Sequence, residues 1–187
     1  MSREDKSSSK PETQRLFFAL WPPAELSHAL YQLTGNALRG GTGRRVVPEN
    51  IHLTLAFLGS VDVSFRECAE QAAAAIRAAS FTLALEQMGY WSKSGILWVG
   101  PNQAPQPLLH LVNDLNAGLA GCGYEAKTRL YAAHLTLARE ARPHGDIHSM
   151  ESRTWEINRF HLAQSHTHAD GAHYEILRSW PLNSPAA

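Results

Sequence analysis

A short segment that occurs twice constrains this chain more than any other feature. The letters "HLTLA" stand at residues 52–56, within "NIHLTLAFLG", and again at residues 134–138, within "AAHLTLARE". The leucines alternate with histidine and threonine, and this period of two is typical of a half-buried strand. The copies lie 82 residues apart in a chain of 187. We therefore expect two related units that each contribute one such strand.

Composition limits the kind of molecule. The chain is 44% hydrophobic and 18% charged, which predicts one compact domain or two small lobes that share a core. Its formal net charge of zero excludes a broad phosphate-binding surface, although a few local cations can still hold a small phosphate ligand. No apolar run approaches the ~18 residues of a membrane span, and no secretory signal is visible. We expect a cytoplasmic protein without membrane contact.

The two cysteines, Cys68 and Cys122, do not have the spacing of metal ligands. One disulfide is compatible with this number. Two free thiols in a reducing cytoplasm are the favoured expectation.

The order of the segments predicts a bilobal fold. Residues 1–13, "MSREDKSSSKPET", are polar and rich in serine, so we expect a disordered tail followed by one domain over residues 14–187. Apolar periodicity there predicts helices and strands in alternation. The expected class is α/β (α+β), with duplicated βαβ-type lobes whose mixed or antiparallel sheets line a central cleft. Helices are expected within 23–38, 63–80 and 105–121, and strands near 15–21, 50–59, 81–91, 96–101, 132–140, 154–165 and 173–182.

The repeated strand presents chemistry on one face. Side chains alternate along a strand, so His52 shares a face with Thr54, and His134 shares one with Thr136. A single His-x-Thr in a strand is usually structural. Here the polar residues repeat as faithfully as the leucines, which favours a functional role.

Two histidines across a cleft form an acid–base pair, since one imidazole can be neutral while the other is charged. The hydroxyls of Thr54 and Thr136 can donate to phosphate oxygens between them. This set predicts in-line displacement at phosphorus without a metal or other cofactor. Arg139, Arg44 and Arg45 are the candidate phosphate-binding cations. The alternatives are a strand-end ion pair for Arg139 and a solvated glycine-rich loop for the other two.

Other candidates are weaker. The cluster "SHTHADGAHY", residues 165–174, could hold a metal, but it lacks cysteine and a regular carboxylate pattern, so a solvated loop is favoured. Lys127 and Arg129 are further basic candidates. Trp91 or Tyr90 could stack on a nucleobase, or could pack at the rim of the core.

The paired His-x-Thr-x motifs resemble those of the 2H phosphoesterase superfamily. They resemble most the RNA 2′,3′-cyclic phosphodiesterases, also called 2′-5′ RNA ligases of the LigT/ThpR type. The resemblance runs from Arg15 to Pro181 and includes "RLFFAL", "ILWVG" and "HLTLAR". Its last part is carried by Phe160, Leu162, Ser165, Gly171, Tyr174, Leu177 and Trp180. Two departures are Ala133, where the family often has proline, and Lys93, where it often has arginine.

The resemblance implies a bilobal fold with one motif per lobe. It implies hydrolysis of an RNA 2′,3′-cyclic phosphate to a 2′-phosphate end. We also expect a monomer without cofactors, with tRNA fragments among its RNA substrates. His52 matches the family's proton donor and His134 its proton acceptor, while Thr54 and Thr136 match the phosphate-binding hydroxyls. Three alternatives stay open. These are a small cyclic-phosphate nucleotide as substrate, reversible 2′-5′ RNA ligation in RNA processing, and RNA-end binding without turnover.

Overall fold

The computed structural model of the chain describes residues 13–126, 130–144, 147, 150–168 and 171–183. All but Thr13 of the expected tail lies outside these residues, as do Lys127 and Arg129. The tail and the domain boundary therefore stay predictions. No helix among the described residues is long and apolar enough to cross a membrane.

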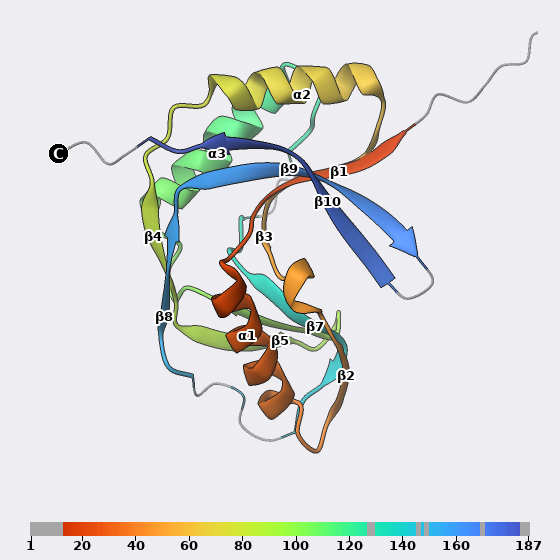
Figure 1. Cartoon of the computed structure of the whole chain (residues 1–187), viewed down its shortest axis with the longest axis vertical. Helices are drawn as coiled ribbons and strands as arrows, with labels where there is room; N and C mark the ends of the chain where they lie inside the picture. The colour runs from red at the N-terminus through yellow and green to blue at the C-terminus, as the bar shows by residue number, and fades with distance from the viewer. Residues whose placement is uncertain (1–12, 127–129, 145–146, 148–149, 169–170, 184–187) are drawn as a thin grey trace, which may run out of the picture.

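The fold is α+β and is built around one large antiparallel sheet (Figure 1). The strands follow the order β10-β9-β1-β3-β7-β6-β5, with β2 beside β7, and β4 pairs with β8 in a separate two-stranded sheet. Every ladder between these strands is antiparallel, which confirms the expected class. The strands are β1 (Gln14–Leu20), β2 (Thr42–Arg45), β3 (Leu53–Val61), β4 (Phe81–Leu85), β5 (Gln87–Trp91), β6 (Ile96–Gly100), β7 (Leu135–Arg142), β8 (Arg153–Ile157), β9 (Arg159–His168) and β10 (Gly171–Pro181).

The duplication is visible in the connections. Strand β1 leads through helix α1 (Ala24–Ala37) to its neighbour β3, and β6 leads through α3 (Gln106–Ala120) to its neighbour β7. In each unit the second strand begins directly after the histidine of the repeated segment. Because both strand pairs are antiparallel, the units are strand–helix–strand repeats without the parallel pairing of a βαβ crossover.

The helices form as the apolar spacing predicts. The buried residues of α3 are Leu108, Leu111, Val112, Leu115 and Leu119, which form one stripe at helical spacing. Asp62 caps α2 (Val63–Ala75) by accepting a hydrogen bond from the Phe65 amide at 2.8 Å. Helices α2 and α3 lie together on one part of the sheet, and α1 lies on the other (Figure 1).

The two halves of the sheet meet at one residue pair. Leu53 of β3 faces Leu135 of β7, and this is the single register pair between the two strands. Both leucines are fully buried. The helices reinforce the junction, because α1 packs against β7 and α3 packs against β3. Each helix thus covers the motif strand of the other unit.

Several expected segments differ in detail. The predicted strand over 81–91 divides into β4 and β5, and the one over 154–165 divides into β8 and β9, because the chain changes sheets at each point. The basic glycine-rich segment, expected as a loop, contains β2, whose pairing with β7 supplies backbone partners. The histidine-rich segment is also not a loop in its described residues, since β9 and β10 form a hairpin there.

The expectation of two free thiols is wrong. Cys68 of α2 and Cys122, two residues beyond α3, are joined in a disulfide, with a Cα–Cα distance of 5.8 Å. The packing of α2 on α3 brings them together, and no local sequence pattern shows this contact.

This disulfide should stabilise the fold measurably. It links residues 54 positions apart, and closing a loop of that length restricts the unfolded chain by about 4 kcal/mol in the chain-entropy model. We expect reductant to lower the unfolding free energy by roughly 2–4 kcal/mol, as measured by denaturant titration. The matched control is the Cys68→Ser/Cys122→Ser variant, which should not respond to reductant. Equal stability of the native chain with and without reductant would contradict the expectation.

Candidate active site

Both motif histidines are oriented by the same backbone contact. The Nδ1 atom of His52 lies 2.7 Å from the Asn50 carbonyl oxygen, and that of His134 lies 2.7 Å from the Ala132 carbonyl oxygen. A carbonyl oxygen only accepts hydrogen bonds, so Nδ1 donates in each case and the neutral tautomer carries its proton there. The Nε2 atom of each ring is then the nitrogen left for chemistry.

The junction of the two strands brings the four motif side chains together. His52 and Thr54 flank Leu53, and His134 and Thr136 flank Leu135, so all four residues lie beside the one pair that joins β3 to β7. The charges of Arg139 and His134 both act on His52, and that of Arg139 also acts on His134, which is consistent with this grouping. The leucines point into the core, so the histidines and threonines share the other face.

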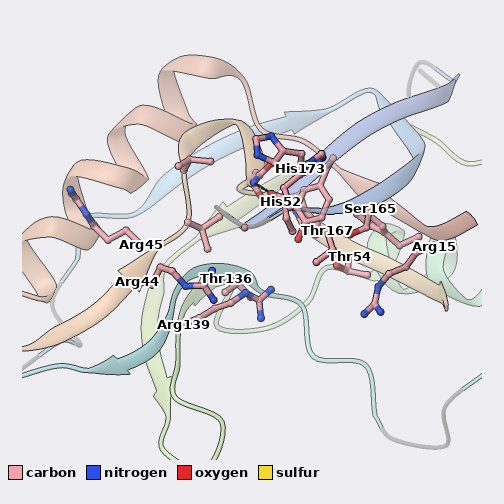
Figure 2. A pocket seen from close by; sticks show the side chains of 18 of the residues that line it. Arg15, Arg44, Arg45, His52, Thr54, Thr136, Arg139, Ser165, Thr167 and His173 are labelled. Carbon is pink, nitrogen blue, oxygen red and sulfur yellow. Dashed lines mark hydrogen bonds between the residues drawn. The ribbon is translucent and has the colours of Figure 1, made fainter. Parts of the chain in front are cut away.

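A cavity of about 710 Å³ opens over this face (Figure 2). His52, Thr54 and Thr136 line it, whereas His134 is not among the lining residues. The described residues that line it include four arginines and no aspartate or glutamate. The lining arginines are Arg15, Arg44, Arg45 and Arg139. In a chain with 17 basic and 17 acidic residues, this segregation of charge favours an anionic ligand.

The three arginines singled out from the sequence differ in their surroundings. Arg139 on β7 lines the cavity and forms no ion pair with a described carboxylate. Arg44 on β2 contacts Glu140 at 3.4 Å, and the guanidinium of Arg45 lies 4.1 Å from the centre of the Tyr31 ring. Arg139 is therefore the one of the three with no competing charged or aromatic partner in the described structure.

Aromatic rings enclose His52, and none of them was singled out from the sequence as a site residue. Trp21 stacks on the imidazole with ring centres 5.1 Å apart, and Phe17 and Tyr174 each lie 5.0 Å away. The Trp21 indole donates to the Glu49 carbonyl at 3.0 Å, which holds this ring in place. The sequence feature that could have indicated Trp21 is the "LWPP" segment, where this tryptophan precedes two prolines at the end of β1.

His134 has a more open setting. The edge-on contact of its ring is with Trp91, at 4.6 Å between ring centres. Trp91 is 37% exposed and lies outside the lining of the cavity. Tyr90, the other candidate for base stacking, packs against the core.

Two further contacts hold the motif segments in place. The Tyr131 hydroxyl donates to the Thr54 carbonyl at 2.9 Å, so the segment before the second motif is bonded directly to the first. Gly100 lies so close to that segment that a Cβ atom there would be 2.5 Å from the Ala133 carbonyl oxygen. Any side chain at Gly100 would therefore displace the backbone that orients His134.

The histidine-rich hairpin does not form a metal site in its described residues. His166 contacts Glu175 at 3.2 Å, and the rings of His168 and His173 lie 4.9 Å apart. Throughout the described ranges, no group of three or more His, Cys, Asp or Glu side chains is placed to hold a metal ion.

Comparison with known proteins gives a consistent result. Residues 20–98 match the model of the LigT-like phosphoesterase family, and this range includes the first motif. An RNA 2′,3′-cyclic phosphodiesterase of Escherichia coli K12 is 33% identical over 172 residues, which cover 91% of this chain and 98% of that protein.

The chain belongs to the LigT-like phosphoesterase family. A relative named RNA 2′,3′-cyclic phosphodiesterase from Thermus thermophilus is 27% identical over 90% of both chains. Among solved structures, E. coli LigT complexed with 3′-AMP superposes with a TM-score of 0.85 at 33% identity, covering 91% of this chain and 99% of that one. A structure described as a phosphoesterase reaches a TM-score of 0.87 at 32% identity, over 92% of this chain and all of the other. The family fold therefore extends across both motifs, including the second one, which lies beyond the matched range of the family model.

The surroundings of the motif histidines in this family member disfavour their charged forms. Burial lowers the pKa of His52 to about 4; the hydrogen bond to Asn50 opposes this, and the charges of Arg139 and His134 add to it. Burial also lowers the pKa of His134 below its ordinary value; its hydrogen bond to Ala132 opposes the shift and Arg139 adds to it. Both imidazoles are therefore neutral at neutral pH unless an anion binds beside them.

Binding of an anion should raise the lowered pKa of His52. A phosphate ion between the motifs stabilises an imidazolium, so it should raise the pKa of His52 from about 4 toward neutrality. Nitrogen-15 NMR of the imidazole groups, titrated with and without inorganic phosphate, measures this shift. His110 is the control, because it is exposed on α3 and its resonances should not respond to phosphate. A His52 titration that is unchanged by saturating phosphate would contradict the expectation.

Proposed function

We propose that this chain hydrolyses the 2′,3′-cyclic phosphate ends of RNA to 2′-phosphomonoesters. The observation that carries the proposal is the pair of histidines held in one tautomer by identical contacts, with the threonines of both motifs lining the adjacent cavity. The curated relatives named RNA 2′,3′-cyclic phosphodiesterase, which include proteins of E. coli and T. thermophilus, support the choice of reaction.

The reaction needs two proton transfers around one displacement. His134, neutral at Nε2, takes a proton from water as the water oxygen bonds to phosphorus. The bond from phosphorus to the ribose 3′ oxygen breaks, and protonated His52 gives its proton to that oxygen. Thr54, Thr136 and Arg139 stabilise the charge on the non-bridging oxygens. These residues supply the acid, the base and the anion-binding groups, so we propose that no metal or other cofactor is needed.

The surroundings of the two histidines support this division of roles. His134 has the more open setting, which suits a base that acts on water. His52 is enclosed by aromatic rings, which exclude water around the leaving group. Binding of the anionic phosphate favours the charged form of His52, which takes its proton from solvent and can then give it to the leaving oxygen.

The cavity supports a nucleotide as the substrate. Its described lining contains four arginines and no aspartate or glutamate, which suits the phosphate of a nucleotide. Both motifs come from one chain, so we propose that a monomer is sufficient. We also propose that the protein acts in the cytoplasm on processed RNA. With a 5′-hydroxyl in place of water, the same groups would catalyse 2′-5′ ligation.

The reaction can be tested with a short RNA that ends in a 2′,3′-cyclic phosphate. We expect turnover to continue in excess chelator and to yield the 2′-phosphate, identified by chromatography against both authentic isomers. The His52→Ala/His134→Ala double variant controls for contaminating nucleases. Binding without turnover would favour an RNA-end binder. Activity that is lost on chelation and restored by a divalent metal would contradict the metal-free mechanism.

Single substitutions should separate the two roles. His52→Ala and His134→Ala should each lower kcat by roughly 10²–10⁴-fold, the usual range for one general acid or base. Thr54→Ala and Thr136→Ala should each lower it by about 10–10³-fold, as for the loss of one oxyanion donor. His110→Ala is the matched control and should not change turnover, because this side chain is exposed on α3.

The leaving group distinguishes acid from base. A 3′-bridging phosphorothiolate has a thiolate leaving group that needs little protonation. It should therefore recover part of the activity of His52→Ala and none of that of His134→Ala. Recovery in His134→Ala alone would reverse the assignment, and wild-type turnover in either single variant would show that the paired-histidine mechanism is wrong.

A further inference from the structure

The cavity contains more positive charge than one cyclic phosphate requires. A nucleoside 2′,3′-cyclic phosphate carries a single negative charge, and Arg139 and the two motifs are placed to meet it. Arg44 is balanced by Glu140. Arg45 packs on Tyr31 of α1 and lies with Arg44 at the other end of the cavity from Arg15 (Figure 2). Arg15 also lines the cavity, and the contacts proposed for the cyclic phosphate do not use its charge.

Arg15 lies at the far end of the cavity from Arg44 and Arg45 (Figure 2). On β1 it is opposite Ser60 of β3, whereas Ala19 is opposite Thr54. Four residues of strand separate these positions, which is about 13 Å. The backbone of Arg15 is therefore well separated from the first motif along β1, and its side chain lines the same cavity from the other end of the strand.

The guanidinium of Arg15 is available for a ligand. Its side chain is exposed, and among the described residues no carboxylate pairs with it. The guanidinium carbon lies over the Phe57 ring, 5.0 Å from the ring centre. This contact uses the face of the guanidinium, and its N–H groups form no hydrogen bond or ion pair with another described residue. Ser165 of β9 also lines the cavity and is drawn at the same end (Figure 2).

We propose that Arg15 binds the phosphodiester that joins the terminal nucleotide to the rest of an RNA. This inference rests on the proposed function. An RNA end has a second negative charge one nucleotide upstream of the cyclic phosphate, and a free nucleoside cyclic phosphate has none. A guanidinium suits this contact, because its planar fork matches two phosphate oxygens. Arg15 is thus the residue that makes the site select RNA ends over free cyclic nucleotides.

Three substrates of increasing size test the assignment. They are adenosine 2′,3′-cyclic phosphate, the same molecule with a 5′-phosphate, and the dinucleotide ApA with a 2′,3′-cyclic phosphate end. In the wild-type protein we expect kcat/KM to rise about 10–100-fold when the upstream phosphate is present, the range for one charge-assisted hydrogen bond. Arg15→Ala should reduce this preference at least tenfold, and Arg15→Lys should retain part of it.

The salt dependence gives a second readout. For the dinucleotide, the slope of log kcat/KM against log salt concentration should become shallower by about 0.7 in Arg15→Ala, as expected when one phosphate contact on a single strand is lost. Arg39→Ala is the matched control, since Arg39 is exposed and does not line the cavity. It should change neither the preference nor the slope.

The outcomes separate this inference from the proposed function. If Arg15→Ala lowers kcat/KM equally for all three substrates, or leaves the preference unchanged, the phosphodiester contact is wrong while the hydrolysis stands. If the wild-type protein hydrolyses none of the three, the proposed function fails and this inference fails with it. Calorimetry with the corresponding 2′-phosphate products makes the same comparison without turnover. Equal affinity of Arg15→Ala and the wild-type protein for the dinucleotide product would also overturn the proposal.

Discussion

The active-site arrangement depends on one contact between two halves of a sheet. Leu53 and Leu135 are fully buried and face each other at the single register pair of β3 and β7. Because side chains alternate along a strand, burying these leucines turns the adjacent histidines and threonines to the opposite face. A slip of one residue in either strand would put polar groups in the core, so the hydrophobic effect fixes the register and with it the site.

The two units are alike in sequence but give their histidines different environments. Trp21, Phe17 and Tyr174 surround His52, whereas Trp91 contacts His134 on one side. Symmetry alone would supply two equivalent imidazoles, and acid–base catalysis needs two that differ. Enclosure by aromatic rings makes the charged form of His52 depend on a bound anion, so the proton can be present when there is a leaving group to receive it.

The sequence was informative wherever a local pattern carried the signal. The helices follow from apolar spacing, and the class of fold follows from the order of segments. The sequence did not predict the features that form only through contact with a distant segment of the chain. The segment around Arg44 is a strand because β7 lies beside it, and the histidine-rich segment is part of a hairpin because β9 and β10 pair with each other. The disulfide depends on the packing of α2 against α3.

The sequence by itself determined the paired motif, the shared face of each histidine and threonine, and the class of chemistry, because these depend on residue identity and the period of a strand. Only the tertiary structure decided the surroundings of each histidine and the separate positions of Arg15 and Arg139. It also decided that no carboxylate is among the described residues that line the cavity. These features arise where segments far apart in the chain meet. Burial and charge at such a meeting point depend on every neighbour, and no single segment encodes them.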